Sequence, residues 1–204
     1  MMPMATTTGS RRNIAALRKA DWGLMITPDI HTTHGFDKYA IDNGAWGCFQ
    51  RNTEWLPSRW TPLVEAKGAD ALFSVAPDIV CGGMASLAVS LSWIGWLLDR
   101  TPIALIAVQN GMTAADLLPH VGDRVGIFVG GDTEWKEASL PVWGALAAQT
   151  GCYLHVGRVN TARRIRLCAM AGAHSFDGTS ASKFSITVAP LTTAAKQAAF
   201  RFDT

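Results

Sequence analysis

Short apolar runs alternate along the chain with longer segments whose apolar residues recur at helical spacing. Most of the apolar runs end in glycine, proline or aspartate, which form turns. The pattern predicts strands at Gly23–Thr27, Tyr39–Asp42, Ala71–Ala76, Ile103–Gln109, Val125–Val129, Tyr153–Val156, His174–Asp177 and Phe184–Val188. It predicts helices between them at Pro62–Ala66, Met84–Leu98, Thr113–Leu118, Leu140–Gln149 and Thr161–Ala171.

Strands that alternate with helices indicate an α/β protein with a parallel sheet. About eight strands fit a small, single-domain (β/α)8 TIM-type barrel best, although 204 residues are near the lower end for that fold. A doubly wound open sheet is the alternative. No repeat or linker divides the chain, so residues 10–204 are interpreted as one domain behind a flexible tail of residues 1–9. Ser10 is expected to cap a short helix that contains Ile14 and Leu17.

The composition excludes some classes of protein. Hydrophobic residues make up 49% of the chain and the net charge is +2, which excludes a disordered chain. The 18 basic and 16 acidic residues are dispersed, which argues against a polyanion-binding tail but leaves a local nucleic-acid patch open. The uncharged segment Ile79–Leu98 has the length of a membrane span, but its serines and glycines favour a strand end, a turn and a buried helix. We therefore expect no membrane contact.

Cysteines and targeting signals indicate a reducing compartment. Cys48, Cys81, Cys152 and Cys168 lie far apart and form no zinc motif, so they are interpreted as small hydrophobic residues. The first residues lack the apolar core of a signal peptide, which predicts a cytoplasmic protein.

Polar residues follow the apolar runs at their carboxyl ends. In a parallel β/α fold these ends share one face, which carries the active site. The same residue types also form turns and helix caps, so each one alone is weak evidence. The residues are Asp42-Asn43-Gly44, Asp78, Gln109-Asn110-Gly111, Gly130-Gly131-Asp132, His155 to Gly157, and Asp177-Gly178.

Carboxylate chemistry is what this set supports. No nucleotide-binding glycine loop and no recognisable nucleophile motif is present. The pair His31 and His34 has no evident third ligand, which disfavours a metal site. One aspartate as nucleophile and another as acid/base would suit displacement at an anomeric carbon through a covalent glycosyl intermediate.

The ordered motifs resemble the tRNA-guanine transglycosylase superfamily. They are Asp42-Asn-Gly-Ala-Trp46, Asp78, Val108-Gln109-Asn-Gly, Val129-Gly-Gly131, Tyr153-Leu-His-Val-Gly157 and Phe176-Asp177, and they span roughly residues 39–183. The chain is most similar to the compact members, often encoded by phages, that insert 7-deazaguanines into DNA.

The resemblance implies a role for each matching residue. Asp177 would attack C1′ of the target nucleoside, and Asp42 would manage the proton of the departing or incoming base. Trp46 and His155 would lie on the two faces of the base. Asp78 would accept from the guanine N1–H and 2-amino group, while Gln109 and the backbone of Gly130-Gly131 would read its carbonyl edge.

The sequence also departs from the family pattern. The tight cysteine and histidine cluster of the tRNA enzymes is missing, so no zinc is expected and tRNA is a less suitable substrate than DNA. The segment after Gly131 is Asp132-Thr-Glu-Trp instead of a small apolar run, which leaves the accepted deazaguanine open. Arg163, Arg164 and Arg166, together with Lys183, are candidates for phosphate contacts, with a solvated basic face as the alternative.

The sequence thus predicts a pentosyltransferase that exchanges guanine in DNA for a base such as preQ0, without cofactor or metal. A nucleoside or glycoside hydrolase and a catalytically silent nucleic-acid-binding subunit are the alternatives. A bacterial or phage-infected cell is the expected setting, and the chain is compatible with a homodimer.

Overall fold

The computed structural model describes residues 1–200 of the chain. Eight strands and nine α-helices are found among these residues, with one 3-10 turn at Ser185–Thr187. The strands are β1 (Met2–Thr6), β2 (Gly23–Ile26), β3 (Tyr39–Ile41), β4 (Ser74–Val75), β5 (Ala104–Val108), β6 (Val125–Val129), β7 (Leu154–Val156) and β8 (Ser175–Gly178). The helices are α1 (Arg11–Lys19), α2 (Ala45–Gln50), α3 (Pro57–Lys67), α4 (Gly83–Leu98), α5 (Ala114–Leu117), α6 (Thr133–Thr150), α7 (Ala162–Met170), α8 (Ser180–Lys183) and α9 (Val188–Phe200).

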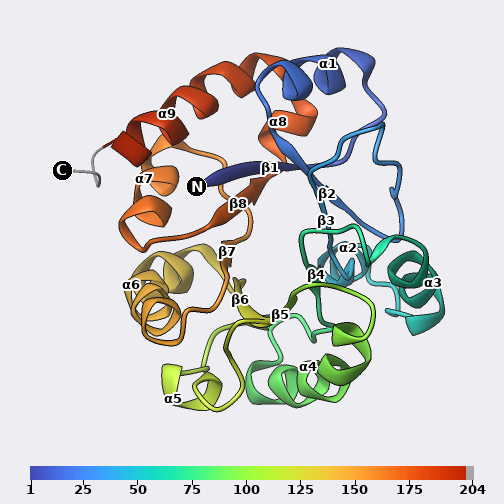
Figure 1. Ribbon diagram of the computed structural model, residues 1–204, viewed down its shortest axis with the longest axis vertical. Coiled ribbons are helices and arrows are strands. Elements are labelled where there is room, and N and C mark those ends of the chain that lie inside the picture. The colour runs from blue at the N-terminus through green and yellow to red at the C-terminus, as the bar shows by residue number, and fades with distance from the viewer. Residues whose placement is uncertain (201–204) are drawn as a thin grey trace.

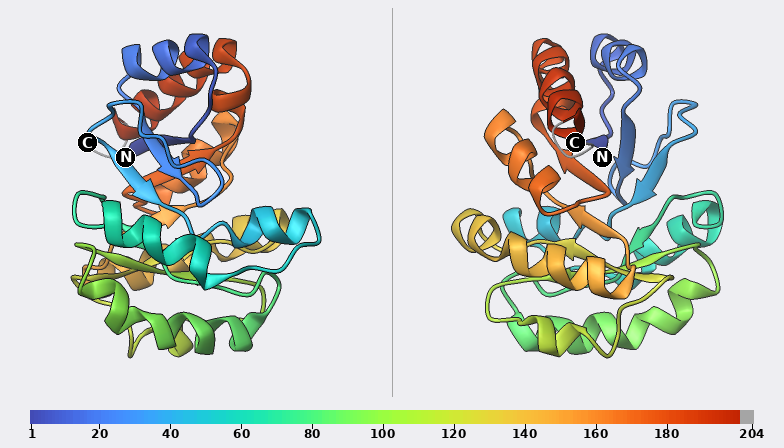
Figure 2. Two further views of the ribbon diagram at one scale, coloured as in Figure 1. Left: turned by 90° about the vertical axis from the view of Figure 1, so that its right-hand side faces the viewer. Right: turned by 60° about the vertical axis from the view of Figure 1, so that its left-hand side comes forward.

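The strands form a closed parallel barrel in chain order, and the helices surround it (Figure 1). Closure depends on β1, which pairs with β2 on one side and with β8 on the other, for example through Met4 opposite Gly23 and Asp177. The side views in Figure 2 show the helices stacked outside the strands. The (β/α)8 barrel predicted from the alternation of strands and helices is confirmed.

Strand residues alternate between two cores. In β5, Leu105 and Ala107 point into the barrel, whereas Ala104, Ile106 and Val108 pack against the helices. This is the two-residue period of a strand. The same period directs His155 of β7, and Ser175 and Asp177 of β8, into the barrel, because their neighbours Leu154, Val156 and Phe176 belong to the outer core.

The first nine residues are not a flexible tail. Residues 2–6 form β1, and Met4 and Ala5 are fully buried. The short segment contains a proline and only two large apolar side chains, so it lacked a clear strand pattern. The structure therefore extends the predicted domain to the first residues of the chain, while its last four positions lie outside the described residues.

The other predicted elements overlap observed ones, apart from those near the carboxyl end, but α3 and α6 begin five and seven residues before the predicted helices Pro62–Ala66 and Leu140–Gln149. Seven of the eight predicted strands are present, and Ser10 caps α1 through its side chain as expected. The predicted strand Phe184–Val188 is wrong. It contains the 3-10 turn, and Phe184 and Ile186 are 60% and 80% exposed, so its apolar pattern does not reflect burial. Helices α2, α8 and α9 were not predicted.

The uncharged segment that begins at Ile79 contains α4, which packs its Ser86 and Ser90 inward. None of the helices within residues 1–200 has the length and apolar character needed to cross a bilayer.

A buried charge in β1 tests whether the first residues close the barrel. We expect Met4→Asp to destabilise the protein by about 4 kcal/mol or more, because it places a carboxylate in the apolar barrel interior. Gly9→Asp is the control, since a side chain at this exposed position meets no atom within 4 Å. Thermal unfolding followed by circular dichroism measures both. Equal unfolding temperatures for the two variants would show that β1 is dispensable.

Candidate active site

The carboxyl ends of the strands bring the predicted aspartates to one mouth of the barrel. Asp42 follows β3, Asp78 follows β4, Gln109 follows β5, and Asp177 lies in β8. The closed parallel barrel brings these strand ends to the same rim, and Gln109 Nε2 and Asn43 Nδ2, next to Asp42, both donate to Asp78. The convergence predicted from the positions of these residues after the strands is present in the structure.

A chain of buried hydrogen bonds holds Asp177. The Tyr153 hydroxyl donates to Ser175 Oγ at 2.9 Å, and Ser175 Oγ lies 2.7 Å from His155 Nδ1. His155 Nε2 then lies 3.1 Å from Asp177 Oδ1. These contacts are all satisfied when Ser175 donates to Nδ1 and a neutral His155 donates from Nε2. Burial raises the pKa of Tyr153, which keeps its hydroxyl a donor.

Asp177 Oδ1 has contacts with His155 in β7 and with Arg158, two residues after β7 ends. The backbone N–H of Arg158 also donates to Oδ1, at 3.3 Å. Within residues 1–200, no group donates a hydrogen bond to Oδ2. The carboxylate is thus fixed in orientation through Oδ1, while Oδ2 has no donor among these residues.

His155 does not have the role predicted for it. Its side chain is fully buried, stacks on Phe128 with the ring centres 4.9 Å apart, and packs against Phe73 at 5.1 Å. A base therefore has no access to the imidazole ring. Because β7 points this residue into the barrel, His155 positions Asp177 instead of stacking on a base.

Asp42 is half-buried on the turn that follows β3. Gly44 has a φ of +78°, which favours glycine, and its backbone N–H donates to Asp42 Oδ1 at 2.6 Å. Burial raises the pKa of Asp42 to about 7, and the charges of Asp177 and Asp78 add to the rise, while the Gly44 N–H opposes it. Asp42 can therefore both give and take a proton near neutral pH.

Asp78 is held by two amides. Asn43 Nδ2 donates to Oδ1 at 2.8 Å, and Gln109 Nε2 donates to Oδ2 at 2.5 Å. Burial raises the pKa of Asp78 to about 6, although both amide bonds lower it. Gln109 Oε1 accepts from the Gly82 N–H, so the protein itself contacts both polar atoms of the amide. In this structure Gln109 supports Asp78, and Asn43, to which the sequence assigned no role, does the same.

Trp46 stands at the mouth with 39% of its surface exposed. Phe49 stacks beside it at 5.6 Å, and the guanidinium carbon of Arg158 lies 4.3 Å from the centre of its ring. Arg158 also donates to the carbonyl oxygen of Gly131. Its side chain thus crosses from the end of β7 to Trp46 and Gly131.

The Gly130-Gly131 step forms the β6 side of the mouth. Gly131 has a φ of +69°, and a Cβ atom there would lie 2.4 Å from the Trp135 ring, so only glycine fits. The N–H of Gly130 donates to the carbonyl oxygen of Val108, which extends the pairing of β6 with β5 by one hydrogen bond. The carbonyl oxygen of Gly131 accepts from the Arg158 guanidinium group. The Gly130 N–H is therefore already used within the barrel, and contact of the Gly131 backbone with a base remains a prediction.

Lys136 is a buried cation that no sequence pattern indicated. Its side chain lies in the first turn of α6, the residue is 6% exposed, and it donates to the Gly157 carbonyl at 2.5 Å. Burial lowers its pKa to about 8, and Arg158 adds to the effect, whereas Asp177 opposes it. Lys136 thus anchors the segment that carries the Arg158 N–H.

The predicted phosphate contacts lie on the rim. Arg163 and Arg164 at the start of α7 both bind Glu137, at 2.5 Å and 2.9 Å. Lys183 ends α8, the helix after Asp177, and is exposed, as is Arg166 on α7. His31 and His34 lie in the loop between β2 and β3. No group of three or more His, Cys, Asp or Glu side chains in residues 1–200 is placed to hold a metal.

Comparison with known proteins adds little to this geometry. No protein-family model and no curated protein matches the chain. Among solved structures, the chain is similar to a point mutant of an active chimera of (S)-mandelate dehydrogenase, with a TM-score of 0.42 and 14% identity. That match covers 98% of this chain and 65% of the other, and at this level it carries no argument about function.

The raised pKa of Asp42 predicts a pH-dependent effect on stability. A carboxyl group in the unfolded chain ionises near pH 4, so ionisation of Asp42 makes the folded state progressively less stable from about pH 4 to pH 7. We expect Asp42→Asn to gain stability relative to the wild type across this interval, because asparagine can still accept from Gly44. Unfolding temperatures at pH 5 and pH 8 measure the gap, with the exposed Asp70→Asn as control. A gap that is the same at both pH values would contradict the assignment.

Proposed function

We propose that the protein is a base-exchange glycosyltransferase that replaces guanine in DNA with a 7-deazaguanine base such as preQ0. The observation that carries the proposal is the pair Asp177 and Asp42. The two carboxyl groups share one mouth but differ in environment, as paired groups for nucleophile and acid/base work do. Asp177 is oriented by His155 and the Arg158 N–H, whereas Asp42 has a pKa of about 7.

The proposed reaction has two balanced halves. Asp177 Oδ2 attacks C1′ of the target nucleotide, the C1′–N9 bond breaks, and the departing guanine takes the proton of Asp42. The incoming base then gives its N9 proton to Asp42 and attacks C1′, which releases the Asp177 carboxylate. A covalent ester separates the two halves, so the kinetics are of the ping-pong type.

Base recognition is supported by the donors and acceptors at the mouth. Asp78, with a pKa of about 6, is an acceptor at neutral pH and suits the adjacent N1–H and 2-amino donors of guanine. Trp46 offers a ring face for stacking. To reach these groups, a nucleotide in DNA would have to be flipped out of its stack.

The direct test is a base-exchange assay on DNA containing guanine, with tRNA in parallel. Purified protein is incubated with preQ0, and the polymer is digested to nucleosides for mass spectrometry. We expect the deazaguanine nucleoside in DNA, and we expect its loss in Asp177→Ala, because this variant lacks the attacking oxygen. Asp70→Ala, which removes a carboxylate from the loop before β4 at the opposite end of the barrel, is expected to retain activity.

Other outcomes of this assay would indicate a different reaction, a different polymer or a binding protein. Guanine released without any preQ0 incorporated would indicate a hydrolase, and incorporation into tRNA would change the polymer. The absence of both products, in protein with a normal unfolding transition, would contradict the proposal and favour a binding subunit.

Arg158 provides a second prediction about the same site. Because its guanidinium group covers Trp46, a base that stacks there must displace it. We expect Arg158→Met to lower the KM for preQ0 by about two- to fivefold, the range of an exposed cation–π contact. Arg100→Met is a matched control, since Arg100 lies 4.2 Å over Trp96 at the end of α4, away from the mouth. A higher KM in Arg158→Met would instead identify Arg158 as a substrate contact.

A further inference from the structure

A pair of arginines shares one carboxylate on the rim beside Trp46. Arg51 at the end of α2 and Arg59 in α3 bind the two oxygens of Asp29, at 2.6 Å and 2.7 Å. Their side chains are 49% and 55% exposed. Each guanidinium group has five N–H donors, so both keep donors free toward solvent after binding Asp29. The cluster carries a net charge of +1.

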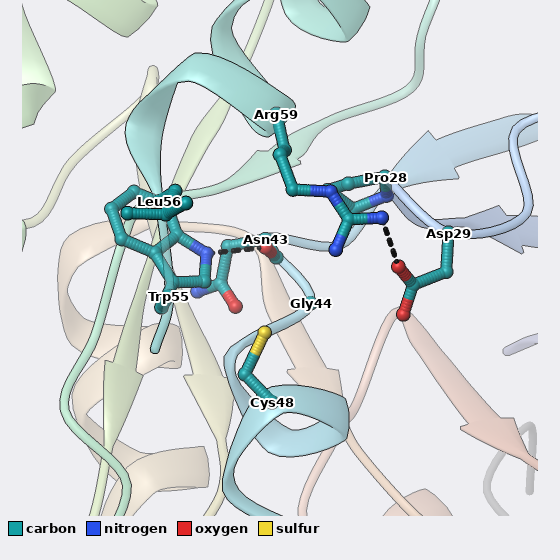
Figure 3. A pocket seen from close by; sticks show the side chains of 8 residues that line it. All are labelled: Pro28, Asp29, Asn43, Gly44, Cys48, Trp55, Leu56 and Arg59. Carbon is teal, nitrogen blue, oxygen red and sulfur yellow. Dashed lines mark hydrogen bonds and ion pairs between the residues drawn. The ribbon is translucent and has the colours of Figure 1, made fainter. Parts of the chain in front are cut away.

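A groove lies against this cluster. It is a shallow groove, lined by Pro28, Asp29, Asn43, Gly44, Cys48, Trp55, Leu56 and Arg59. Figure 3 shows Arg59 and Asp29 joined at one side and Trp55 at the other. The Trp55 indole N–H donates to the Asn43 carbonyl at 2.8 Å, so this aromatic wall is held in place.

The groove is connected to the base site through Asn43. This residue lines the groove, and its side chain donates to Asp78 Oδ1. The neighbouring Gly44 lines the groove as well and donates to Asp42. The groove and the base site therefore lie against the same turn, Asn43-Gly44.

A second cluster of the same composition lies across the mouth. Arg163 and Arg164 bind the two oxygens of Glu137, again with a net charge of +1. Asp29 follows β2 and Arg51 and Arg59 follow β3, whereas Glu137 follows β6 and the other arginines follow β7. In an eight-stranded barrel these positions are half a turn apart. Figure 1 accordingly shows α2 and α3 on the opposite side of the barrel from α6 and α7.

We propose that Arg51, Arg59 and the adjoining groove form a phosphate-binding site for a segment of DNA strand next to the nucleotide in the base site. The inference rests on the proposed function for the placement of that nucleotide. A strand that delivers one base to Asp177 must leave the mouth on two sides, and the two arginine clusters lie on such opposed sides. Arginine forks suit phosphate oxygens, and the apolar wall of Trp55 and Leu56 suits a sugar or a base.

Binding of DNA that contains no guanine tests the proposed phosphate site separately from the base-exchange reaction. Fluorescently labelled oligothymidylate is titrated with protein at several salt concentrations, and binding is followed by anisotropy. We expect the double variant Arg51→Gln/Arg59→Gln to bind about tenfold more weakly. The slope of log K against log salt should be shallower by about 1.4, because each lost phosphate contact on a single strand contributes about 0.7.

A charge-matched control removes the general effect of net charge. Lys19→Gln/Lys38→Gln also removes two positive charges, but these residues lie at the end of α1 and just before β3, at the other end of the barrel. We expect this control to keep both the affinity and the salt slope of the wild type. Arg163→Gln/Arg164→Gln is expected to weaken binding as the first double variant does. Thermal unfolding verifies that every variant is folded.

Three results would overturn the inference: no binding of oligothymidylate by the wild type, unchanged binding in the Arg51/Arg59 variant, or equal losses in the lysine control. The outcome is separable from that of the exchange reaction. If binding depends on Arg51 and Arg59 but no base is exchanged, the phosphate site stands and the proposed chemistry fails. If exchange occurs while binding ignores these arginines, only the phosphate site fails.

Discussion

Closure of the sheet by β1 is the constraint on which the rest of this structure depends. A strand of five residues fills the gap between β2 and β8, and its register places Met4 opposite Asp177. Once the barrel is closed, each strand has one face inside and one face toward the helices, and all carboxyl ends share one rim. The buried orientation of Asp177 and the gathering of carboxylates at the mouth both follow from that closure.

The carboxyl groups gathered at the rim differ from one another in pKa and in how their orientation is fixed. Asp42 has little to compensate its burial apart from one backbone N–H, so its pKa rises to about 7. Asp78 is similarly enclosed, but two amides hold its oxygens and limit the rise of its pKa to about 6. Asp177 has its orientation set by His155, which is itself fixed by Ser175 and two aromatic rings. Side chains of one type thus differ in pKa and in orientation because their partners differ.

Cations complete the electrostatic arrangement of the mouth. Lys136 and Arg158 approach the carboxylates from α6 and the segment after β7, and Lys136 bonds the carbonyl just before Arg158. The two arginine clusters extend the positive rim outward, each partly neutralised by an acidic residue. This distribution suits an anionic polymer that contacts the rim while one of its bases enters the mouth, which is the common element of the proposed activity and the proposed phosphate site.

The sequence by itself determined the alternation of strands and helices, and with it the barrel and the position of Asp42, Asp78, Gln109 and Asp177 after or within strands. These features are local, since they depend on periodicity and on the residues that end each run.

Tertiary structure alone decided the rest. β1 was recognisable as a strand only through its partners β2 and β8. The family resemblance placed His155 against a base, and nothing local reveals that Phe128 and Phe73 cover its ring. Arg158, Lys136 and Asn43 act through contacts with residues 19 to 112 positions away, and such contacts depend on barrel closure, which no local pattern records.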